Sequence, residues 1–395
     1  MYRLAPHLRD YAWGSRTAIP ELLGTAATSA PVAEAWFGAH PSAPSTLPDL
    51  GRSLDEHIAA DPAAALGDDV VARFGPRLPY LLKLIAPAAP ISLQVHPTLA
   101  QAAAGYARED GGGLPLDAPT RSYRDRNHKP EIVFALTTFE ALSGFRAPRR
   151  AAEILASLDT PLAGGLRDAL RSAPSAAGME QAFRLLLDPA AGATPDEVTR
   201  LAQACAARLA AGTSPSTRAD AVVTLLQEAH PGDPGVVAAL LLNPVTLQPG
   251  EALFTPAGSI HTYLSGLAVE VMANSDNVIR AGLTPKHVDV DGLLEIVDYV
   301  AAPPIRLAPE RAHENTDVYY APVDDFELTL THATPQPTAV AGRGPRILLV
   351  VAGTAHLEAA GTAHDLRRGD AVFLPASDDG ARLSGDATLA QAGVP

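Results

Sequence analysis

Residues Gly250 to Lys286 read GEALFTPAGSIHTYLSGLAVEVMANSDNVIRAGLTPK and combine a histidine, an acid, an arginine and a lysine with the pattern of paired β-strands. The first half of this segment follows the spacing G-x5-P-x-G-x2-H, in which Gly250, Pro256 and Gly258 precede His261. Glycine and proline favour tight turns between short strands. These turns are predicted to aim His261 into a β-structure, where residues of neighbouring strands can hold a metal with it. A histidine that merely sits in a hairpin is the alternative for this segment taken alone.

An upstream segment, ISLQVHP, supplies further polar side chains with strand spacing. In residues 91 to 97 three apolar residues alternate with Ser92, Gln94 and His96. Side chains of a strand alternate between its faces, so these three polar groups are predicted to line one face together. A polar-faced surface strand is the alternative.

A second segment, NHKPEIVFAL, spans residues 127 to 136 and contains Lys129 and Glu131 two positions apart. They share a face if the segment enters a strand, so Glu131 can bind a metal while Lys129 points to a substrate. The combined candidate ligands are two imidazoles, one carboxylate and one amide oxygen: His96, His261, Glu131 and Gln94. This mixture suits Zn²⁺ with open positions, and Mn²⁺, Fe²⁺ and Co²⁺ stay open as alternatives.

Composition limits the classes of protein that this chain can be. With 395 residues, 47% of them hydrophobic, it is expected to form two or three domains with real cores. The single cysteine, Cys205, excludes an intramolecular disulfide and fits a reducing compartment, so a cytoplasmic location is expected. The net charge of −14, with no basic stripe, argues against nucleic-acid binding. No signal peptide is evident, and no apolar run reaches the ~18 residues of a membrane helix.

The basic residues are unevenly chosen. Lysine and arginine together number 30, yet only three are lysines: Lys83, Lys129 and Lys286. All three lie in or near the segments that carry the other candidate residues. Lysine is a compact, movable donor with a tunable pKa, unlike arginine. Their distribution therefore points to one shared site.

The chain alternates between β-type and helical sequence. Residues 1–146 combine short apolar runs with Pro, Gly, Asp and Ser clusters, which is typical of a sheet. Residues 147–243 are rich in Ala, Leu, Arg and Gln and contain a helix start at Thr194-Pro195-Asp196-Glu197, so they are predicted to be a helical insertion. β-type sequence resumes over 244–316, which would complete a discontinuous catalytic domain. Residues 317–395 are predicted to form a second, small barrel.

A weak internal repeat supports the second barrel. Gly369, Pro375 and Ser377 reproduce the G-x5-P-x-G frame with one substitution, and Gly380 stands at the position that matches His261. This barrel is therefore expected to keep the turn geometry and to lack the metal ligand. Chance similarity is the alternative, because G-x5-P is a common spacing.

These segments resemble a known family. The spacing that ends at His261 is similar to the second signature of the cupin β-barrel, and Gln94 with His96 resembles the first signature. The following segments are similar, in order, to those of the type I mannose-6-phosphate isomerases: YAWGS (11–15), AEAWFGAHP (33–41), LPYLLKLI (78–85), QVHP, NHKPE, PAGSIHTYLSG and NSDNVIRAGLTPKHVDV. The resemblance implies a mainly β fold of cupin (jelly-roll) β-barrels, a catalytic barrel and a degenerate C-terminal one, with an inserted α-helical domain.

The resemblance also implies roles for individual residues. One Zn²⁺ per chain would be bound by Gln94, His96, Glu131 and His261. The catalytic residues would be Arg280, Glu270 and Lys129, and the sugar-phosphate pocket would also contain Trp13, Ser92, Tyr263, Asp276 and Lys286. The partner is then a small sugar phosphate, with no nucleic acid or membrane partner, and the chain is expected to be a monomer.

The implied reaction interconverts D-mannose 6-phosphate and D-fructose 6-phosphate through a cis-enediolate that zinc would stabilise. A positioned general base must remove the carbon-bound proton. Glu270 is the first candidate, because LAVEVMA alternates and puts it on the face opposite Val269 and Val271. The alternative is a buried salt bridge between Glu270 and Arg280. Arg280 suits stabilisation of the enediolate or the phosphate, since an arginine pKa lies above about 12.

Two other functions stay open from the sequence. A different cupin metalloenzyme, such as an iron-dependent dioxygenase, would use the same barrel, although its chemistry does not require Arg280, Lys286 and Lys129 together. A non-catalytic sugar-phosphate-binding cupin is the other.

Overall fold

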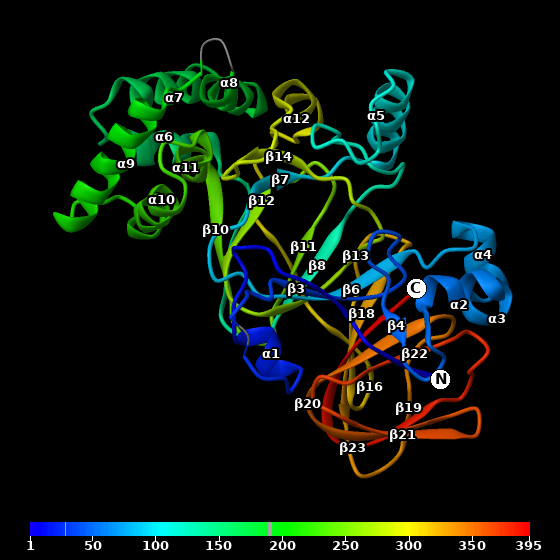
Figure 1. The fold of residues 1–395 in the computed structure, drawn as a ribbon. Coiled ribbons are helices and arrows are strands. Elements are labelled where there is room, and N and C mark those ends of the chain that lie inside the picture. The colour runs from blue at the N-terminus through cyan, green and yellow to red at the C-terminus, as the bar shows by residue number, and fades with distance from the viewer. Residues whose placement is uncertain (28, 189–191) are drawn as a thin grey trace.

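The computed structural model describes residues 1–27, 29–188 and 192–395, and two β-sheets lie at the centre of the chain (Figure 1). The seven-stranded sheet contains, in spatial order, β15 (Ile305–Leu307), β11 (Ala252–Thr255), β8 (Glu131–Ala135), β13 (Ala268–Ala273), β6 (Tyr80–Ile85), β3 (Glu34–Phe37) and β2 (His7–Arg9). The five-stranded sheet contains β10 (Leu242–Leu247), β9 (Phe139–Phe145), β12 (His261–Ser265), β7 (Leu93–Val95) and β14 (Ile279–Gly282). A buried cluster that includes Val133, Leu253, Phe139 and Val245 joins one sheet to the other. The two sheets therefore face each other.

Alternation along the strands separates the inner face of each sheet from its outer face. Val269 and Val271 of β13 join an outer core, whereas Glu270 between them contacts Lys83 of β6. Leu93 and Val95 of β7 likewise join a core on the other outer face. The predicted alternation of both segments is confirmed, and it directs their polar residues into the space between the sheets.

Helices cover the outer face of the five-stranded sheet (Figure 1). They are α6 (Pro148–Leu155), α7 (Pro161–Ser172), α8 (Ala176–Leu187), α9 (Pro195–Ala210), α10 (Thr217–Ala229), α11 (Pro234–Ala238), the 3-10 helix η1 (Ala239–Leu241) and α12 (Val290–Ile296). The predicted helix start is confirmed at α9, where Thr194 and Glu197 form a reciprocal capping box. Arg208 of α9 is buried and donates to both carboxylate oxygens of Asp220 of α10 at 2.6 Å, which ties these two helices together.

A third sheet packs on the outer face of the seven-stranded sheet. It consists of β1 (Tyr2–Leu4), β16 (Glu310–His313), β17 (Thr316–Tyr319), β18 (Glu327–Ala333), β19 (Thr338–Ala339), β20 (Arg346–Ala359), β21 (Thr362–Arg367), β22 (Ala371–Leu374) and β23 (Arg382–Gly393). Strand β1 pairs with β22, so the first residues of the chain extend the C-terminal sheet. The sequence does not predict this pairing.

The internal repeat has a structural counterpart. Gly250 and Gly369 have φ values of 92° and 93°, a conformation that favours glycine, and each precedes a four-residue strand, β11 or β22. Pro256 and Pro375 each follow the strand directly. The match then ends, because β12 begins at His261 whereas Gly380 lies in a turn.

The remaining elements connect these layers. They are α1 (Ala18–Leu22), β4 (Thr46–Leu47), β5 (Arg52–Ser53), α2 (Leu54–Ala60), α3 (Pro62–Leu66), α4 (Asp68–Phe74) and α5 (Leu99–Gly111). The predicted mainly β fold with added helices is confirmed, and in the described part of the chain the strands form stacked sheets without a ladder that closes a barrel. Within the same residues, every helix is too short or too polar to span a bilayer.

Candidate metal centre and substrate pocket

Three ionisable side chains converge between the two central sheets. His96 follows β7, Glu131 begins β8 and His261 begins β12, and all three are buried. One ligand atom from each lies within 4.8 Å of the others. Glu131 Oε1 is 3.3 Å from His96 Nε2, and Glu131 Oε2 is 3.4 Å from His261 Nε2. The stacked sheets thus bring together three of the four predicted metal ligands.

In both histidines Nε2 faces Glu131, while Nδ1 forms a hydrogen bond to a backbone carbonyl. His96 Nδ1 donates to the carbonyl of Asn277 at 2.7 Å, and His261 Nδ1 donates to the carbonyl of Ser259 at 3.1 Å. The two Nε2 atoms are buried and have no hydrogen-bond partner among the described residues. Buried polar atoms are normally satisfied, and a carbonyl on the second nitrogen is usual for metal-binding histidines. The donor set therefore fits zinc with nitrogen and oxygen ligands.

The sheet register places Gln94 next to the triad. Gln94 of β7 is directly opposite His261 of β12 on one side and Arg280 of β14 on the other. Cross-strand partners point to the same face of a sheet. Gln94, His261 and Arg280 therefore form one row on the inner face, and the role of Gln94 as the fourth ligand stays a prediction.

The charges around the triad set its protonation. Lys129 Nζ lies 3.0 Å from Glu131 Oε1. Burial alone would raise the pKa of Glu131, but the Lys129 ammonium and then His96 and His261 outweigh it and hold this pKa well below its usual range. Burial, assisted by Lys129, lowers the pKa of His96 to about 4. Near neutral pH the site thus presents an anionic carboxylate and a neutral imidazole, as metal binding requires.

A second buried network lies beside the triad on the inner face of the seven-stranded sheet. Lys83 Nζ is 2.9 Å from Glu270 Oε2 and 3.9 Å from Glu34 Oε1, and Trp36 Nε1 donates to Glu34 Oε2 at 2.8 Å. Although burial opposes it, the charge of Glu270, and then of Glu34, raises the pKa of Lys83. Burial is the main cause that raises the pKa of Glu270; Glu131 and Glu34 add to this rise, whereas the charges of Lys83 and Lys129 oppose it.

The interpretation of Glu270 as a salt-bridge partner of Arg280 is wrong. Glu270 of β13 is in register with Lys83 of β6, the neighbouring strand, whereas Arg280 belongs to β14 in the other sheet. The short loop between β13 and β14 crosses from one sheet to the other, which the sequence pattern does not reveal.

The other predicted pocket residues lie around these groups. Tyr263 is buried, and its hydroxyl donates to Glu131 Oε2 at 3.4 Å. Asp276 Oδ1 is 3.5 Å from Nε2 of buried His40. Trp13 packs against the core between the sheets and stacks on Tyr11, with 5.6 Å between ring centres.

Lys286 and Ser92 complete the predicted set. Exposed Lys286 has its Nζ 5.4 Å from the centre of the Tyr11 ring. Ser92 is half-buried and lies two residues before Gln94, just outside β7.

Arg280 belongs to a group of four cationic side chains, the others being Arg124, Lys286 and Arg9. The guanidinium group of Arg280 has no hydrogen-bond or ion-pair partner within the described part of the chain, and burial together with the charge of Arg124 lowers its pKa. Burial, Arg280, Arg124 and Arg9 lower the pKa of Lys286 in that order. Arg9 also lies over the Trp36 ring, with Cζ 4.8 Å from its centre. Groups of like charge held together in this way favour a bound anion.

Sequence reasoning missed several of these residues. No role is predicted for Arg9, Arg124, Glu34, Trp36 or His40. The rarity of lysine is the signal that marks Lys83, and alternation of Glu34 and Trp36 in EAWF places them on one face. Arg9 and Arg124 carry no such signal, since arginine is frequent throughout this chain.

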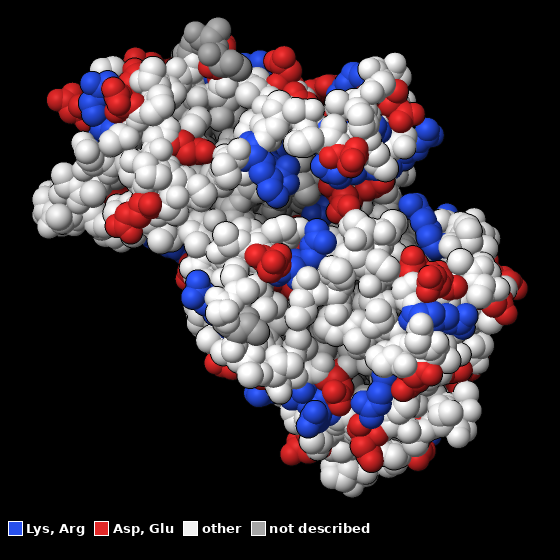
Figure 2. All heavy atoms as spheres, viewed as in Figure 1, with Lys and Arg blue, Asp and Glu red and all other residues white. Residues whose placement is uncertain are grey.

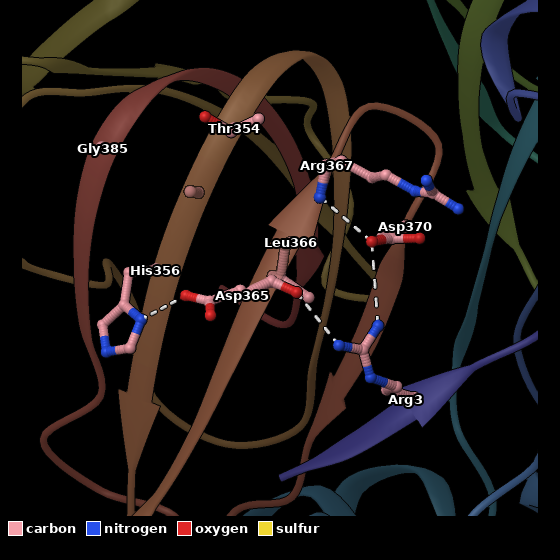
Figure 3. A pocket seen from close by; sticks show the side chains of 9 residues that line it. Arg3, Thr354, His356, Asp365, Leu366, Arg367, Asp370 and Gly385 are labelled. Atoms are coloured by element: carbon pink, nitrogen blue, oxygen red, sulfur yellow. Dashed lines mark hydrogen bonds and ion pairs between the residues drawn. The ribbon is translucent and has the colours of Figure 1, made fainter.

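Charged side chains of both signs border the hollow between the helical end of the molecule and its lower half (Figure 2). A separate, open cavity of about 630 Å³ lies on the C-terminal sheet, lined by Arg3, His356, Asp365 and Asp370 among others (Figure 3). These groups already pair with one another: Arg3 donates to the Asp365 carbonyl at 3.0 Å, and His356 Nδ1 contacts Asp365 Oδ1 at 2.7 Å. The charges that line this cavity are thus largely satisfied, unlike those near Arg280.

The fold and the triad define a cupin-type metal centre. The family described as "Phosphomannose isomerase type I, catalytic domain" matches residues 1–148, and "Mannose-6-phosphate isomerase, cupin domain" matches residues 315–393. The chain belongs to the type I mannose-6-phosphate isomerase family, and it is accordingly an isomerase.

Relatives in distant organisms support this assignment. The mannose-6-phosphate isomerase of Escherichia coli K12 is 38% identical over 399 residues, which cover 99% of each chain. The human protein of the same name is 32% identical over 96% of this chain and 94% of its own. A crystal structure of mannose 6-phosphate isomerase bound with zinc and yttrium superposes with a TM-score of 0.90 at 36% identity, covering 100% of this chain and 99% of the other. The predicted family and enzyme class are confirmed, and the zinc in that relative agrees with the donor set of His96, Glu131 and His261 in this chain.

Proposed function

We propose that this chain interconverts D-mannose 6-phosphate and D-fructose 6-phosphate at the space between its two central sheets. The observation that carries the proposal is the pair of buried Nε2 atoms of His96 and His261, which lack a hydrogen bond among the described residues and lie 3.3 and 3.4 Å from Glu131, next to a group of cationic side chains. A sugar phosphate has a reacting carbonyl end and an anionic phosphate end. A metal centre beside an anion site can bind both ends at once.

His96, Glu131 and His261 are proposed to hold one zinc ion per chain, with Gln94 as the fourth protein ligand. Zinc supplies a Lewis acid that stabilises negative charge on the substrate oxygens at C1 and C2. Lys129, 3.0 Å from Glu131, keeps that carboxylate ionised and adds positive charge on the substrate side.

Glu270 is proposed as the general base. In the direction from mannose 6-phosphate it removes the proton from C2, so that the bonding electrons form the C1–C2 double bond of a cis-enediolate. Return of a proton to C1, with transfer of a hydroxyl proton from O2 to O1, gives the ketose without oxidant or reductant. Burial, which raises the pKa of Glu270, brings its basicity closer to that needed near neutral pH.

Arg280 and Lys286 are proposed to bind the anionic parts of the substrate, the enediolate or the phosphate. Arg280 has free donors at the end of the row that Gln94 and His261 begin. Arginine binds phosphate and carboxylate-like oxygens in a two-pronged geometry. The remaining pocket residues, proposed to orient the sugar, are Trp13, Ser92, Tyr263 and Asp276.

We further propose that segments 1–146 and 244–316 form the catalytic unit, with 147–243 as the helical insertion and 317–395 as the C-terminal, metal-free unit. β8 lies between β11 and β13 in the sheet, which supports a catalytic unit built from both sides of the insertion. A cytoplasmic enzyme without nucleic-acid or membrane partners is proposed from the single cysteine and the net charge of −14, and the chain is also proposed to be a monomer. Sedimentation at micromolar concentration tests the monomer.

A coupled assay for fructose 6-phosphate, started with mannose 6-phosphate, tests the proposed activity. Zinc-loaded protein is expected to turn the substrate over. Tight binding of the sugar phosphate without hydrogen exchange at C2 would identify a binding protein instead. Oxygen consumption with bound iron would identify a dioxygenase.

A further inference from the structure

Asn277 lies in one of two loops beside the metal centre, and its side chain forms hydrogen bonds to the other loop. It is fully buried, with 0% of its surface exposed. Its Nδ2 donates to the carbonyls of Asn127 at 2.8 Å and Asp125 at 2.9 Å, and its Oδ1 accepts from the backbone N–H groups of Arg124 at 2.7 Å and Asp125 at 3.2 Å. One side-chain amide thus satisfies four backbone groups of the segment 124–127.

The backbone of the same residue contacts the metal centre directly. The Asn277 carbonyl accepts the Nδ1 hydrogen of His96 at 2.7 Å. This bond fixes the tautomer of His96 and leaves its Nε2 free for a metal. Asn277 therefore joins a candidate ligand on one side to the loop before Lys129 and Glu131 on the other.

Asp125 and Ser275 reinforce the same junction. Asp125 Oδ2 accepts from the Asp276 N–H at 2.7 Å, and its Oδ1 accepts from the Ser275 hydroxyl at 2.8 Å and from the Asn127 N–H at 2.8 Å. The Ser275 hydroxyl also accepts from the Asn277 N–H at 3.2 Å. Each loop therefore contributes both donors and acceptors to the other.

The two loops need these hydrogen bonds because neither belongs to a helix or to a β-ladder that would satisfy its backbone groups. Residues 124–130 and 275–278 have no helix or strand in the structure. Backbone groups buried outside a sheet require other partners, and here side chains supply them. Lys129 lies in the first loop and Glu131 follows it directly, while Asp276 lies in the second loop and Arg280 follows it in β14, so a shift between the loops would displace all four.

We propose that Asn277 is a positioning residue that locks the 124–127 loop to the 275–280 segment and thereby holds His96, Glu131 and Arg280 in one metal-binding and catalytic geometry. It touches neither substrate nor metal itself. The inference rests on the proposed role of His96 as a zinc ligand.

Zinc affinity measured by chelator competition tests this role, in Asn277→Ala and in the milder Ser275→Ala. Mutation of a residue that forms a hydrogen bond to a metal ligand typically lowers the metal affinity about 10–100-fold. Asn277→Ala is expected to weaken zinc binding by about that factor, and Ser275→Ala by less. The visible absorption spectrum of the Co²⁺-loaded proteins should change in the same order, since it reports ligand geometry, which loss of stability alone does not alter.

Gln391→Ala serves as the matched control. Gln391 is also buried, and its Nε2 donates to the Ala341 carbonyl at 3.0 Å within the C-terminal sheet region. Its variant should bind zinc and Co²⁺ as the wild type does, even where its melting temperature falls. If Asn277→Ala fails to fold, the Ser275→Ala result decides.

The outcome separates this inference from the proposed function. Wild-type zinc affinity and an unchanged Co²⁺ spectrum in both loop variants, with zinc lost in His96→Ala, would overturn the role of Asn277 alone. Full zinc binding by His96→Ala would overturn the proposed metal site itself.

Discussion

Lys83 Nζ and Glu270 Oε2 lie 2.9 Å apart across the adjacent strands β6 and β13, with both side chains buried on the inner face of the sheet. Glu34, at 3.9 Å, shares the same ammonium group. The ion pair with Lys83 keeps Glu270 in a fixed position, and burial raises the pKa of its carboxyl group. A proton acceptor in a reaction at carbon needs this combination of fixed geometry and retained basicity.

Replacing Glu270 with glutamine keeps its size and removes its basicity. We expect kcat to fall by about 10²–10⁴-fold, the usual contribution of a general base. Zinc content should stay at the wild-type level, because Glu270 is not among the candidate ligands. Steady-state kinetics with metal analysis measure both. A Glu270→Gln variant with near-normal kcat would assign the base to another residue.

Arg280→Ala is expected to abolish turnover while the protein keeps its zinc. Arg280 stands next to Gln94 in the register yet has no partner of its own among the described residues, so its charge is available to the substrate. The loss of a charge that acts in the transition state costs about 10²–10³-fold or more. The coupled assay and the zinc content of purified protein provide the measurements. Zinc loss in this variant would show that Arg280 supports the metal site instead.

Lys286→Ala should mainly weaken substrate binding. Lys286 is exposed at the pocket, within the group of cationic residues near Arg280, and belongs to no ion pair found in the described residues. We expect KM for mannose 6-phosphate to rise about tenfold, with a smaller effect on kcat, and inhibition by inorganic phosphate to weaken. The control is Arg367→Ala, which removes a cationic side chain of the C-terminal sheet. Equal KM values in the two variants would exclude Lys286 from phosphate binding.

His40 is expected to make stability depend on pH. Burial outweighs the attraction of Asp276 and lowers the pKa of His40 from 6.5 to about 4. The unfolded chain therefore binds the proton first, so the stabilisation is present above pH 6.5 and is lost as pH falls toward 4. Denaturant unfolding of metal-free protein should show a loss of up to about 3 kcal/mol from this group over that interval. His40→Gln should reduce the slope, and an unchanged slope would argue against a buried neutral His40.

The sequence was sufficient for features that depend on local spacing. The turn at Gly250, the alternation around Glu270 and the capping box at Thr194 each involve residues a few positions apart, and the structure contains all three. The segment before His96 also lies as strand alternation requires, whereas Lys129 lies in a loop and Glu131 is the first residue of β8. Three predicted metal ligands consequently meet between the sheets.

Contacts between segments that are distant in the sequence could not be predicted from local spacing. The pairing of Lys83 with Glu270 depends on β6 and β13 being neighbours, and the position of β1 depends on β22. Arg9 reaches the pocket from the short edge strand β2 and Arg124 from a loop, and neither segment has a periodic signal in its sequence. Asn277 lies within a recognised motif, but its function depends on a loop about 150 residues away, which spacing alone does not reveal.

Metal removal and return test the claim that His96, Glu131 and His261 hold the zinc that the isomerase requires. Wild-type protein treated with a chelator should lose activity on mannose 6-phosphate and regain it on addition of one zinc ion per chain. His261→Ala should bind no zinc and stay inactive in the same titration. Undiminished isomerisation by metal-free wild-type protein, or by zinc-free His261→Ala, would contradict the claim.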